Sequence, residues 1–240
     1  MNISNYYSEN ADGIQFSRQQ ASDFAKQVAD DFNPIHDPDS KRFCVPGDLL
    51  FAVVLSRYGL SEKMHFNFSG LVSDGVPLLF PESDANQIAI TDRQGKEYLN
   101  FERSGAISNA TSLISDLTQS YVAFSGHNFE HVLVPLMRDK DVMINPDRPL
   151  VIYESMSVDL ERFDVTSPQL ILEKSTLDVD GRRGKVRMQF RLTSDQGDFG
   201  HGEKSMILSG LRPADPAALQ GMLDDYIGFK ATYTRPDQVP

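Results

Sequence analysis

The stretch GDLLFAVVLSRYG, residues Gly47 to Gly59, decides the fold, because it predicts a helix that is apolar on every side for two turns. Asp48 stands in the first turn and Arg57 in the last, where the helix dipole favours an acid and a base respectively. Gly59 is the natural residue to end such a helix. Since no face of this helix is polar, we expect other elements to enclose it completely.

Strand patterns surround this helix. MHFNFSG, residues Met64 to Gly70, alternates apolar and polar side chains, which is the period of a half-buried strand. Three more runs, VPLLF, NQIAITD and KEYLNFE, continue it as an antiparallel meander. Ahead of the helix we expect a short strand over Gly13–Ser17 and a helix over Ala21–Asp30 that is capped by Ser22. The first half therefore predicts helices followed by an antiparallel sheet.

The second half repeats this plan. A helix is predicted over Leu113–Phe124 and another over about Glu130–Arg138, and four long alternating runs follow. We therefore interpret residues 1–105 and 106–212 as two copies of one unit, and residues 213–240 as a last helix with a frayed tail. The expected fold class is α+β, with two central helices each wrapped by an antiparallel sheet and the two sheets joined edge to edge.

Composition and charge argue against several function classes. The 240 residues are 40% hydrophobic and 10% aromatic, which is enough for a large core. Lys and Arg number 23 against 34 Asp and Glu, and the net charge of −11 disfavours nucleic acid and anionic lipid as partners. No apolar run approaches the about 20 residues of a membrane-spanning helix, and no leader peptide is recognised. Because the single cysteine, Cys44, cannot form an internal disulfide and no zinc spacing occurs, we expect a cytoplasmic protein without a bound metal.

The most unusual stretch is ADDFNPIHDP, residues Ala29–Pro38, which combines three carboxylates, an Asn-Pro step and a histidine. Pro34 fixes its own φ and pushes Asn33 into an extended conformation, so the segment is a stiff turn. Along such a turn, Asp31 and His36 are close enough for both side chains to face one cavity and share one water. The helix that follows presents free N–H groups, which can bind a developing oxyanion.

DFNPIH followed by VPGDLLFAVVL resembles the signature of the MaoC-like, (R)-specific enoyl-CoA hydratases of the hotdog superfamily. The resemblance implies a double hotdog fold and the addition of water to the β-carbon of a trans-2-enoyl thioester of coenzyme A or acyl carrier protein. It implies that Asp31 and His36 bind and activate the water, and that the N–H of Gly47 polarises the thioester carbonyl. It also implies that Asn33 and Pro46 lie beside the substrate, and it implies no cofactor.

The chain departs from the family pattern at several positions. Pro46 stands where the family has a histidine, and the stretch between the turn and the helix is shorter than in the family. Leu55 or Ser56 falls near a helix position at which a hydratase has a serine, and only Ser56 keeps the hydroxyl, so Ser56 is a candidate substrate-binding residue. In the second half, SGHNFEH places His131 where the histidine would be, without the aspartate or the proline. If there is one active site, it belongs to the first half.

Simpler interpretations of the turn stay open. Asp31 and Asn33 are typical of Asx turns that merely close a loop, and a lone histidine such as His36 is more often a satisfied loop residue than a catalyst. An enoyl-CoA hydratase is the function we favour. The alternatives are an acyl-CoA thioesterase on the same fold, with Asp31 as general base, and a catalytically silent hotdog that binds an acyl ligand or a protein partner. Two units in one chain would imitate the usual hotdog homodimer, so we expect a monomer or a homodimer.

Two further clusters have plain alternatives. His127, Asn128 and His131 are close enough to suggest a metal pair, but no third ligand follows at a recognisable spacing. Arg182 and Arg183 belong to a basic turn, DGRRG, which is either a solvated hairpin tip or a clamp for nucleotide phosphates. We favour the hairpin tip.

Overall fold

The computed structural model describes residues 1–234. Its helices are the short η1 (Ile3–Tyr6), α1 (Arg18–Gln27), the short η2 (Pro34–His36), α2 (Gly47–Tyr58), α3 (Thr111–Gly126), the π-helical η3 (Phe129–Leu133), α4 (Val134–Asp139) and α5 (Pro216–Thr232). Its strands are β1 (Ser8–Asn10), β2 (Gly13–Gln15), β3 (Leu60–Phe68), β4 (Gln87–Thr91), β5 (Glu97–Ser108), β6 (Val142–Met143), β7 (Val151–Leu160), β8 (Gln169–Asp180), β9 (Arg183–Ser194), β10 (Gly197–Ser209) and β11 (Arg212–Pro213). The end of the expected tail, from residue 235 onward, lies outside the described residues. Within residues 1–234, no helix is long and apolar enough to cross a membrane.

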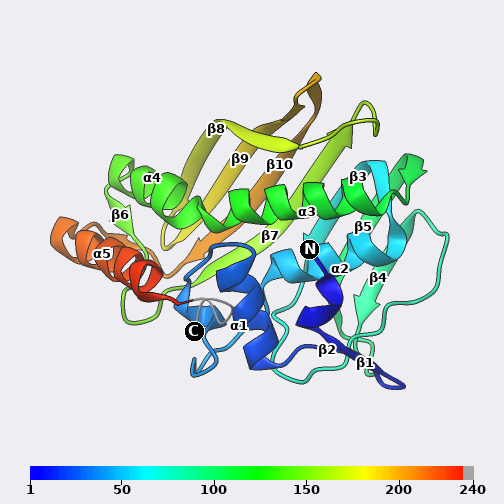
Figure 1. The fold of residues 1–240 in the computed structure, drawn as a ribbon. Coiled ribbons are helices and arrows are strands. Elements are labelled where there is room, and N and C mark those ends of the chain that lie inside the picture. Colours follow the sequence, from blue (N-terminus) through cyan, green and yellow to red (C-terminus); the bar gives the residue numbers. More distant parts are fainter. Residues whose placement is uncertain (235–240) are drawn as a thin grey trace.

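Seven strands form one antiparallel sheet in the order β4-β5-β3-β7-β10-β9-β8 (Figure 1). Strands β3 to β5 come from the first half of the chain and β7 to β10 from the second. The halves join where β3 pairs antiparallel with β7, from Lys63 opposite Asp159 to Asn67 opposite Ser155. The antiparallel α+β fold is as predicted. The sheets of the two halves were expected to join edge to edge, and the β3–β7 pairing does join them, so that they form one main sheet.

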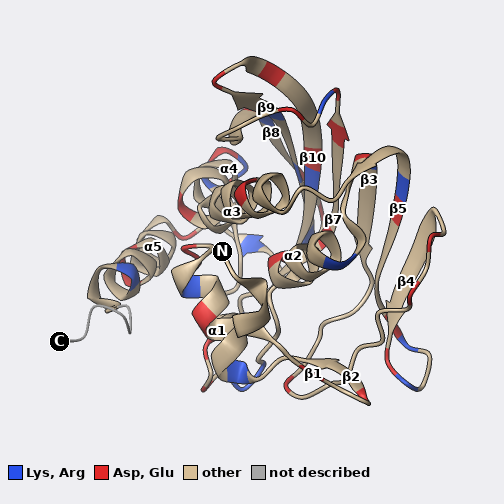
Figure 2. Ribbon diagram, turned by 45° about the vertical axis from the view of Figure 1, so that its right-hand side comes forward, with Lys and Arg blue, Asp and Glu red and all other residues tan. Residues whose placement is uncertain are grey.

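Helices α2, α3 and α4 lie on one face of this sheet (Figure 1). Every residue of α2 from Asp48 to Leu55 is buried, as predicted for a helix enclosed on all sides, and its charges are confined to its two ends (Figure 2). β3 covers one side of α2, and α1, α3 and η1 cover others. Phe51, at 1% exposure, connects these layers, because its ring contacts Phe66 of β3 and Tyr121 of α3 at centroid distances of 5.2 and 4.7 Å. A central helix enclosed by an antiparallel sheet is the arrangement of the hotdog fold.

The long helix of the second half differs from the predicted one. The helix expected over Leu113–Phe124 is α3, with 16 residues, whereas the helix expected over Glu130–Arg138 is divided between η3 and the six-residue α4. His127 and Asn128 keep helical dihedral angles between α3 and η3, so the chain continues from one to the next without a loop. The main helix of this half is therefore α3, and the π-helical turn lies at its end.

Two local predictions are wrong. The Oγ of Ser17 accepts the N–H of Gln20 at 3.2 Å, and the Oε1 of Gln20 accepts the N–H of Ser17 at 3.1 Å. This capping box starts α1 three residues earlier than expected and leaves Ser22, the expected cap, buried inside the helix. The run Val76–Phe80 makes isolated bridges instead of a full strand.

Replacing Phe51 with alanine should lower the free energy of unfolding by about 3–5 kcal/mol, because it leaves a cavity between α2, β3 and α3. Urea denaturation followed by circular dichroism measures this loss. Ile107→Ala is the control, since Ile107 is 47% exposed on β5 and its truncation should change stability by less than about 1 kcal/mol. A loss below about 1 kcal/mol for Phe51→Ala would contradict a fully enclosed α2.

Candidate active site

The loop between α1 and α2 is held by its own hydrogen bonds. Asp30 adopts a φ of 55°, in the left-handed region, where the chain leaves α1. Asp31 Oδ1 accepts the N–H of Asn33 at 2.9 Å, and Asn33 Oδ1 accepts the N–H of Ile35 at 3.2 Å at the start of η2. These Asx turns give Asp31 and Asn33 a structural role. They use only one oxygen of Asp31.

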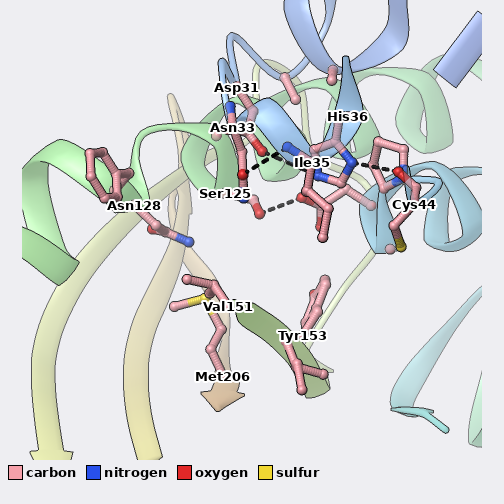
Figure 3. Close-up of a pocket in the computed structure, with 18 of the residues that line it drawn as sticks. Asp31, Asn33, Ile35, His36, Cys44, Ser125, Asn128, Val151, Tyr153 and Met206 are labelled. Atoms are coloured by element: carbon pink, nitrogen blue, oxygen red, sulfur yellow. Dashed lines mark hydrogen bonds and ion pairs between the residues drawn. The ribbon is translucent and has the colours of Figure 1, made fainter. Parts of the chain in front are cut away.

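The remaining oxygen of Asp31 faces His36 (Figure 3). His36 Nδ1 donates to the carbonyl of Cys44 at 2.7 Å, and because a carbonyl can only accept, the neutral imidazole carries its proton on Nδ1. Nε2 is then free to accept a proton. It lies 3.7 Å from Asp31 Oδ2, which is too long for a direct hydrogen bond and suits two groups that bind one water. Asp31 Oδ1 and His36 Nδ1 thus hold the loop, whereas Asp31 Oδ2 and His36 Nε2 are left for the cavity that both residues line.

This cavity has a volume of about 450 Å³, within the range of small-molecule sites. Helix α2 and strand β3 contribute only part of its apolar lining. Leu50 of α2 and Phe68 of β3 do line the cavity, and a second apolar wall comes from the second half and from α5. The residues that form this wall include Phe129, Leu133, Ile144, Val151, Ile152, Met206, Met222 and Phe229.

The N-terminus of α2 borders the same cavity. Pro46 and Gly47 line it, and the N–H groups of Gly47 and Asp48 have no acceptor within the helix. A Cβ at Gly47 would lie 2.7 Å from Cδ1 of Tyr153, whose ring stacks on Phe68 with centroids 4.2 Å apart. Packing alone therefore requires a glycine here, in addition to any role in binding an oxyanion.

Ser56 is not part of the site. It is exposed in the last turn of α2, and because a helix rises 1.5 Å per residue, its nine-residue separation from Gly47 puts it about 13 Å farther along the axis. Leu55 is buried but does not line the cavity either. The expected substrate-binding role of Ser56 is therefore wrong, whereas Asn33 and Pro46 do line the cavity.

The polar end of the cavity also holds a buried network that no sequence motif predicted. Asp48 of α2 is 9% exposed and Lys204 of β10 is 3% exposed. Ser125 of α3 donates to Asp48 Oδ2 and accepts from Lys204 Nζ, and Nζ lies 3.8 Å from Asp48 Oδ1. Nζ also lies 3.9 Å from the ring centroid of Tyr153, whose hydroxyl is hydrogen-bonded to that of Tyr121. Three elements far apart in the sequence thus meet through one lysine.

A signal for Lys204 was present in the sequence. Lys204 precedes Met206 and Leu208 at two-residue spacing, so strand alternation puts it on their apolar face. A charged residue at an inward position is rarely buried unless it is paired. In the sequence, the helix dipole alone accounts for Asp48, and no local pattern marks Ser125.

Helix α5 closes the cavity and holds the loop. The hydroxyl of Tyr226, a residue that is 5% exposed, donates to the carbonyl of Gly126 at 3.2 Å and accepts the N–H of Phe32 at 3.2 Å. It also lies 3.5 Å from Asp31 Oδ1. On the other side, a Cβ at Gly126 would collide with the carbonyl of Ala29, so α3 and the loop are in direct backbone contact. The loop is therefore fixed between α3 and α5.

Burial sets the protonation of these groups. Burial raises the pKa of the Asp31 carboxyl, although nearby His36 opposes the rise. The Asp31 side chain still keeps 24% of its surface exposed, and Asp31 lines the cavity. Burial lowers the pKa of Lys204, against the opposing effect of Asp48. Burial also raises the pKa of the Cys44 thiol to about 12, so this thiol is not a nucleophile at neutral pH.

The other residues singled out from the sequence are mostly outside the cavity. His127 and His131 pair with different carboxylates, at 2.9 and 3.2 Å, and neither lines the cavity. Asn128, between them, does line it. Arg182 and Arg183 are exposed at the β8–β9 turn, away from the cavity lining, as expected of a hairpin tip.

The sequence matches a protein family described as "Protein of unknown function (DUF3581)" over residues 1–217. It has no match among curated proteins. Among solved structures it is similar to a conserved protein of unknown function with hot dog fold from Alicyclobacillus acidocaldarius, with 8% identity over 88% of this chain and 98% of that chain and a TM-score of 0.43.

Two further solved structures are similar, with comparably low sequence identities and TM-scores. An acyl-CoA thioesterase II, TesB2, from Mycobacterium marinum shares 8% identity over 89% of this chain and 99% of that chain, with a TM-score of 0.42. A protein described as a MaoC-like dehydratase shares 11% identity over 84% of this chain and 97% of that chain, with a TM-score of 0.40. No residue role follows from similarities this distant.

Replacing Asp31 with asparagine should raise the free energy of unfolding by about 1 kcal/mol at neutral pH, and Tm by about 2–4 °C, because the amide keeps the turn's acceptor and removes a buried carboxylate. Burial raises the folded-state pKa of Asp31, so this carboxyl destabilises the parent increasingly as pH rises from the unfolded-state pKa through the folded-state pKa. The stability difference should therefore be largest above the folded-state pKa and vanish below about pH 4.

Thermal unfolding of both proteins between pH 4 and pH 8 measures this difference. Asp37→Asn is the matched control, since Asp37 belongs to the same loop and pairs with Lys26 at 2.7 Å outside the cavity lining. An Asp31→Asn protein that is less stable than the parent at neutral pH would show that the Asp31 carboxylate does not destabilise the folded protein.

Proposed function

Because the chain belongs to the DUF3581 family of proteins of unknown function, we propose its activity from its own cavity: it adds water to the double bond of 2-enoyl thioesters. The observation that carries this proposal is the pair Asp31 Oδ2 and His36 Nε2, 3.7 Å apart in one cavity. Hydration requires one group that takes a proton from water and one that gives a proton to the α-carbon. The two facing atoms can take a proton from one bound water and return a proton to the α-carbon.

The reaction balances with the atoms of a single water. Its oxygen bonds to the β-carbon, the π electrons move toward the α-carbon and the thioester carbonyl, and one proton passes to the Asp31–His36 pair. The pair then returns a proton to the α-carbon. In the neutral form of His36, Nε2 is unprotonated and can accept the proton, because Nδ1–H donates to the Cys44 carbonyl. Burial moves the pKa of Asp31 upward, toward the range in which a carboxyl transfers protons efficiently near neutral pH.

The thioester carbonyl is assigned to the N-terminus of α2. Negative charge develops on this oxygen as water adds, and the N–H of Gly47 lies at the positive end of the helix. The acyl chain would follow the apolar wall formed by the second half and α5. Coenzyme A or acyl carrier protein is the proposed carrier, and the cytoplasm is the proposed location.

We further propose that the two halves are diverged copies of one hotdog unit. Each half supplies a long helix on the same face of the sheet, α2 or α3, followed by antiparallel strands. The cavity takes Asp31, His36 and Gly47 from the first half and Ser125 and Lys204 from the second. A monomer would therefore hold a complete site, and association into a homodimer would not be needed to build it.

Thioester hydrolysis is the second candidate function. The geometry that favours it is the position of Gly47 beside the Asp31–His36 pair, because the same water could attack a carbonyl carbon held there. The products separate the two reactions. Hydration removes the conjugated double bond and keeps the thioester, whereas hydrolysis releases a free thiol.

With trans-2-hexenoyl-CoA, the protein should remove the ultraviolet absorbance of the conjugated thioester without releasing thiol. Asp31→Asn and His36→Gln should each lower kcat/KM by about a hundredfold or more, because each removes one proton-transfer group and keeps a hydrogen-bonding side chain. Absorbance and a thiol-reactive dye, recorded in the same reaction, measure both products.

Asp37→Asn again serves as the control and should retain activity within about twofold, since ordinary surface substitutions have small effects. Thiol release by the parent would favour the hydrolase. No change in either signal would favour a silent acyl-binding protein, and an Asp31→Asn protein as active as the parent would leave the loop with a structural role alone.

A further inference from the structure

Lys204 is the only lysine or arginine among the described residues that line the cavity, whereas three aspartates line it. It lies on β10 and is 3% exposed. Its ammonium contacts Ser125 and the ring of Tyr153, two residues that mark this end of the cavity in Figure 3. The proposed hydration leaves this buried cation without a role.

Folding stability does not explain a lysine at this position. Burial lowers the pKa of Lys204, because the protein interior disfavours its charged form. A buried ion pair is often no more stable than well-packed apolar residues of similar volume. Met206 and Leu208, which follow Lys204 on the same face of β10, are apolar and buried, so an apolar residue would suit the strand. A charge that is kept under these conditions is typical of a functional site.

The counter-ion of Lys204 is Asp48, in the first turn of α2. Nζ lies 3.8 Å from Oδ1, and Ser125 links the two residues by accepting from Nζ and donating to Oδ2. Asp48 directly follows Gly47, so its carboxylate lies at the same positive helix end to which the thioester oxygen is assigned. Without a cation, this carboxylate would oppose the negative charge that develops on that oxygen. Lys204 offsets the opposing charge.

The Asp31 carboxyl is coupled to the same pair. Four charged or titratable groups face it, namely His36 of its own loop, Asp48 of α2, Lys204 of β10 and Tyr226 of α5. Burial is the main cause that raises the pKa of Asp31; the charge of Asp48 adds to the rise, and the charge of Lys204 opposes it. Loss of Lys204 alone would therefore leave two carboxylates that repel each other at the polar end of the cavity.

We propose that Lys204 is a positioning residue of the active site: acting through Asp48 and Ser125, it holds the first turn of α2 and neutralises the carboxylate beside the Gly47 N–H. This inference rests on the proposed function and adds to it a residue from the second half of the chain. It assigns Lys204 no contact with the substrate and no proton transfer.

Removing the two charges in turn tests this role. Lys204→Met leaves Asp48 without its cation and should lower kcat for trans-2-hexenoyl-CoA at pH 8 by about tenfold or more, because the lost compensation matters most as negative charge develops. KM should change by less than about threefold, since no substrate contact is removed. Adding Asp48→Asn removes the opposing carboxylate and should restore most of the lost kcat. If Lys204→Met does not fold, Lys204→Gln removes the charge, keeps a donor and should give the same pattern.

Lys63→Met is the matched control. Lys63 of β3 pairs with Asp159 at 3.0 Å, but its side chain is 65% exposed and it does not line the cavity. Because exposed ion pairs contribute little, its loss should change kcat by less than about twofold. Full activity of Lys204→Met overturns the inference. A loss that Asp48→Asn does not restore also overturns it, because Lys204 would then act directly on the substrate or only as part of the core.

Carbon-13 NMR of the aspartate carboxyls follows Asp31 without any turnover. The pKa of Asp31 should be higher in Lys204→Met than in the parent and should return toward the parent value in the double variant, because the second substitution removes the repelling charge. Lys63→Met should leave it unchanged. A purely structural role of Lys204 would not produce this pattern, and an equal pKa of Asp31 in Lys204→Met and the parent overturns the inference.

The proposed function and this inference fail separately. The expected pattern of Asp31 pKa values in a protein that hydrates no enoyl thioester supports the role of Lys204 and rejects the hydratase. Hydration of trans-2-hexenoyl-CoA by the parent and by Lys204→Met at equal rates rejects the inference and leaves the hydratase intact.

Discussion

The enclosure of α2 is the constraint on which the rest of the structure depends. A helix with no polar face must be covered on all sides, and a sheet covers only one of them. Helices α1 and α3 therefore pack on the remaining sides, and the loop between α1 and α2 has to pass the N-terminus of α2. At that point it meets the end of α3 so closely that Gly126 has no room for a side chain against Ala29. The position of the loop follows from the packing of the core.

Enclosing α2 also gathers polar groups at one place. Its first turn carries Asp48, and Ser125 and Lys204 surround that carboxylate inside the protein. Buried ion pairs contribute little net stability, because desolvation offsets most of their attraction. The raised pKa of Asp31 and the lowered pKa of Lys204 have the same cause, which is burial beside a cavity. These features are costly for folding, and shifts of this kind are common at functional sites.

Local patterns in the sequence predicted α2, the strands of the main sheet and the stiff turn, because helix periodicity, strand alternation and Asx chemistry are short-range properties. They did not predict the Asp48–Ser125–Lys204 network, whose members are brought together only by packing. Ser56 shows the same limit, since choosing a helix position by analogy ignored its distance from the cavity. The division of Glu130–Arg138 into a π-helical turn and a short α-helix has one local marker, Pro135 in the first turn of α4, because proline has no N–H to continue the helix.

We propose that the loop and the N-terminus of α2 hold one thioester between them. A crystal structure of the Asp31→Asn protein with trans-2-hexenoyl-CoA tests this arrangement most directly. The thioester oxygen should lie about 2.7–3.2 Å from the Gly47 nitrogen and the β-carbon beside His36, with the chain against the apolar wall. A thioester bound outside this cavity, or with its carbonyl turned away from Gly47, would rule the arrangement out.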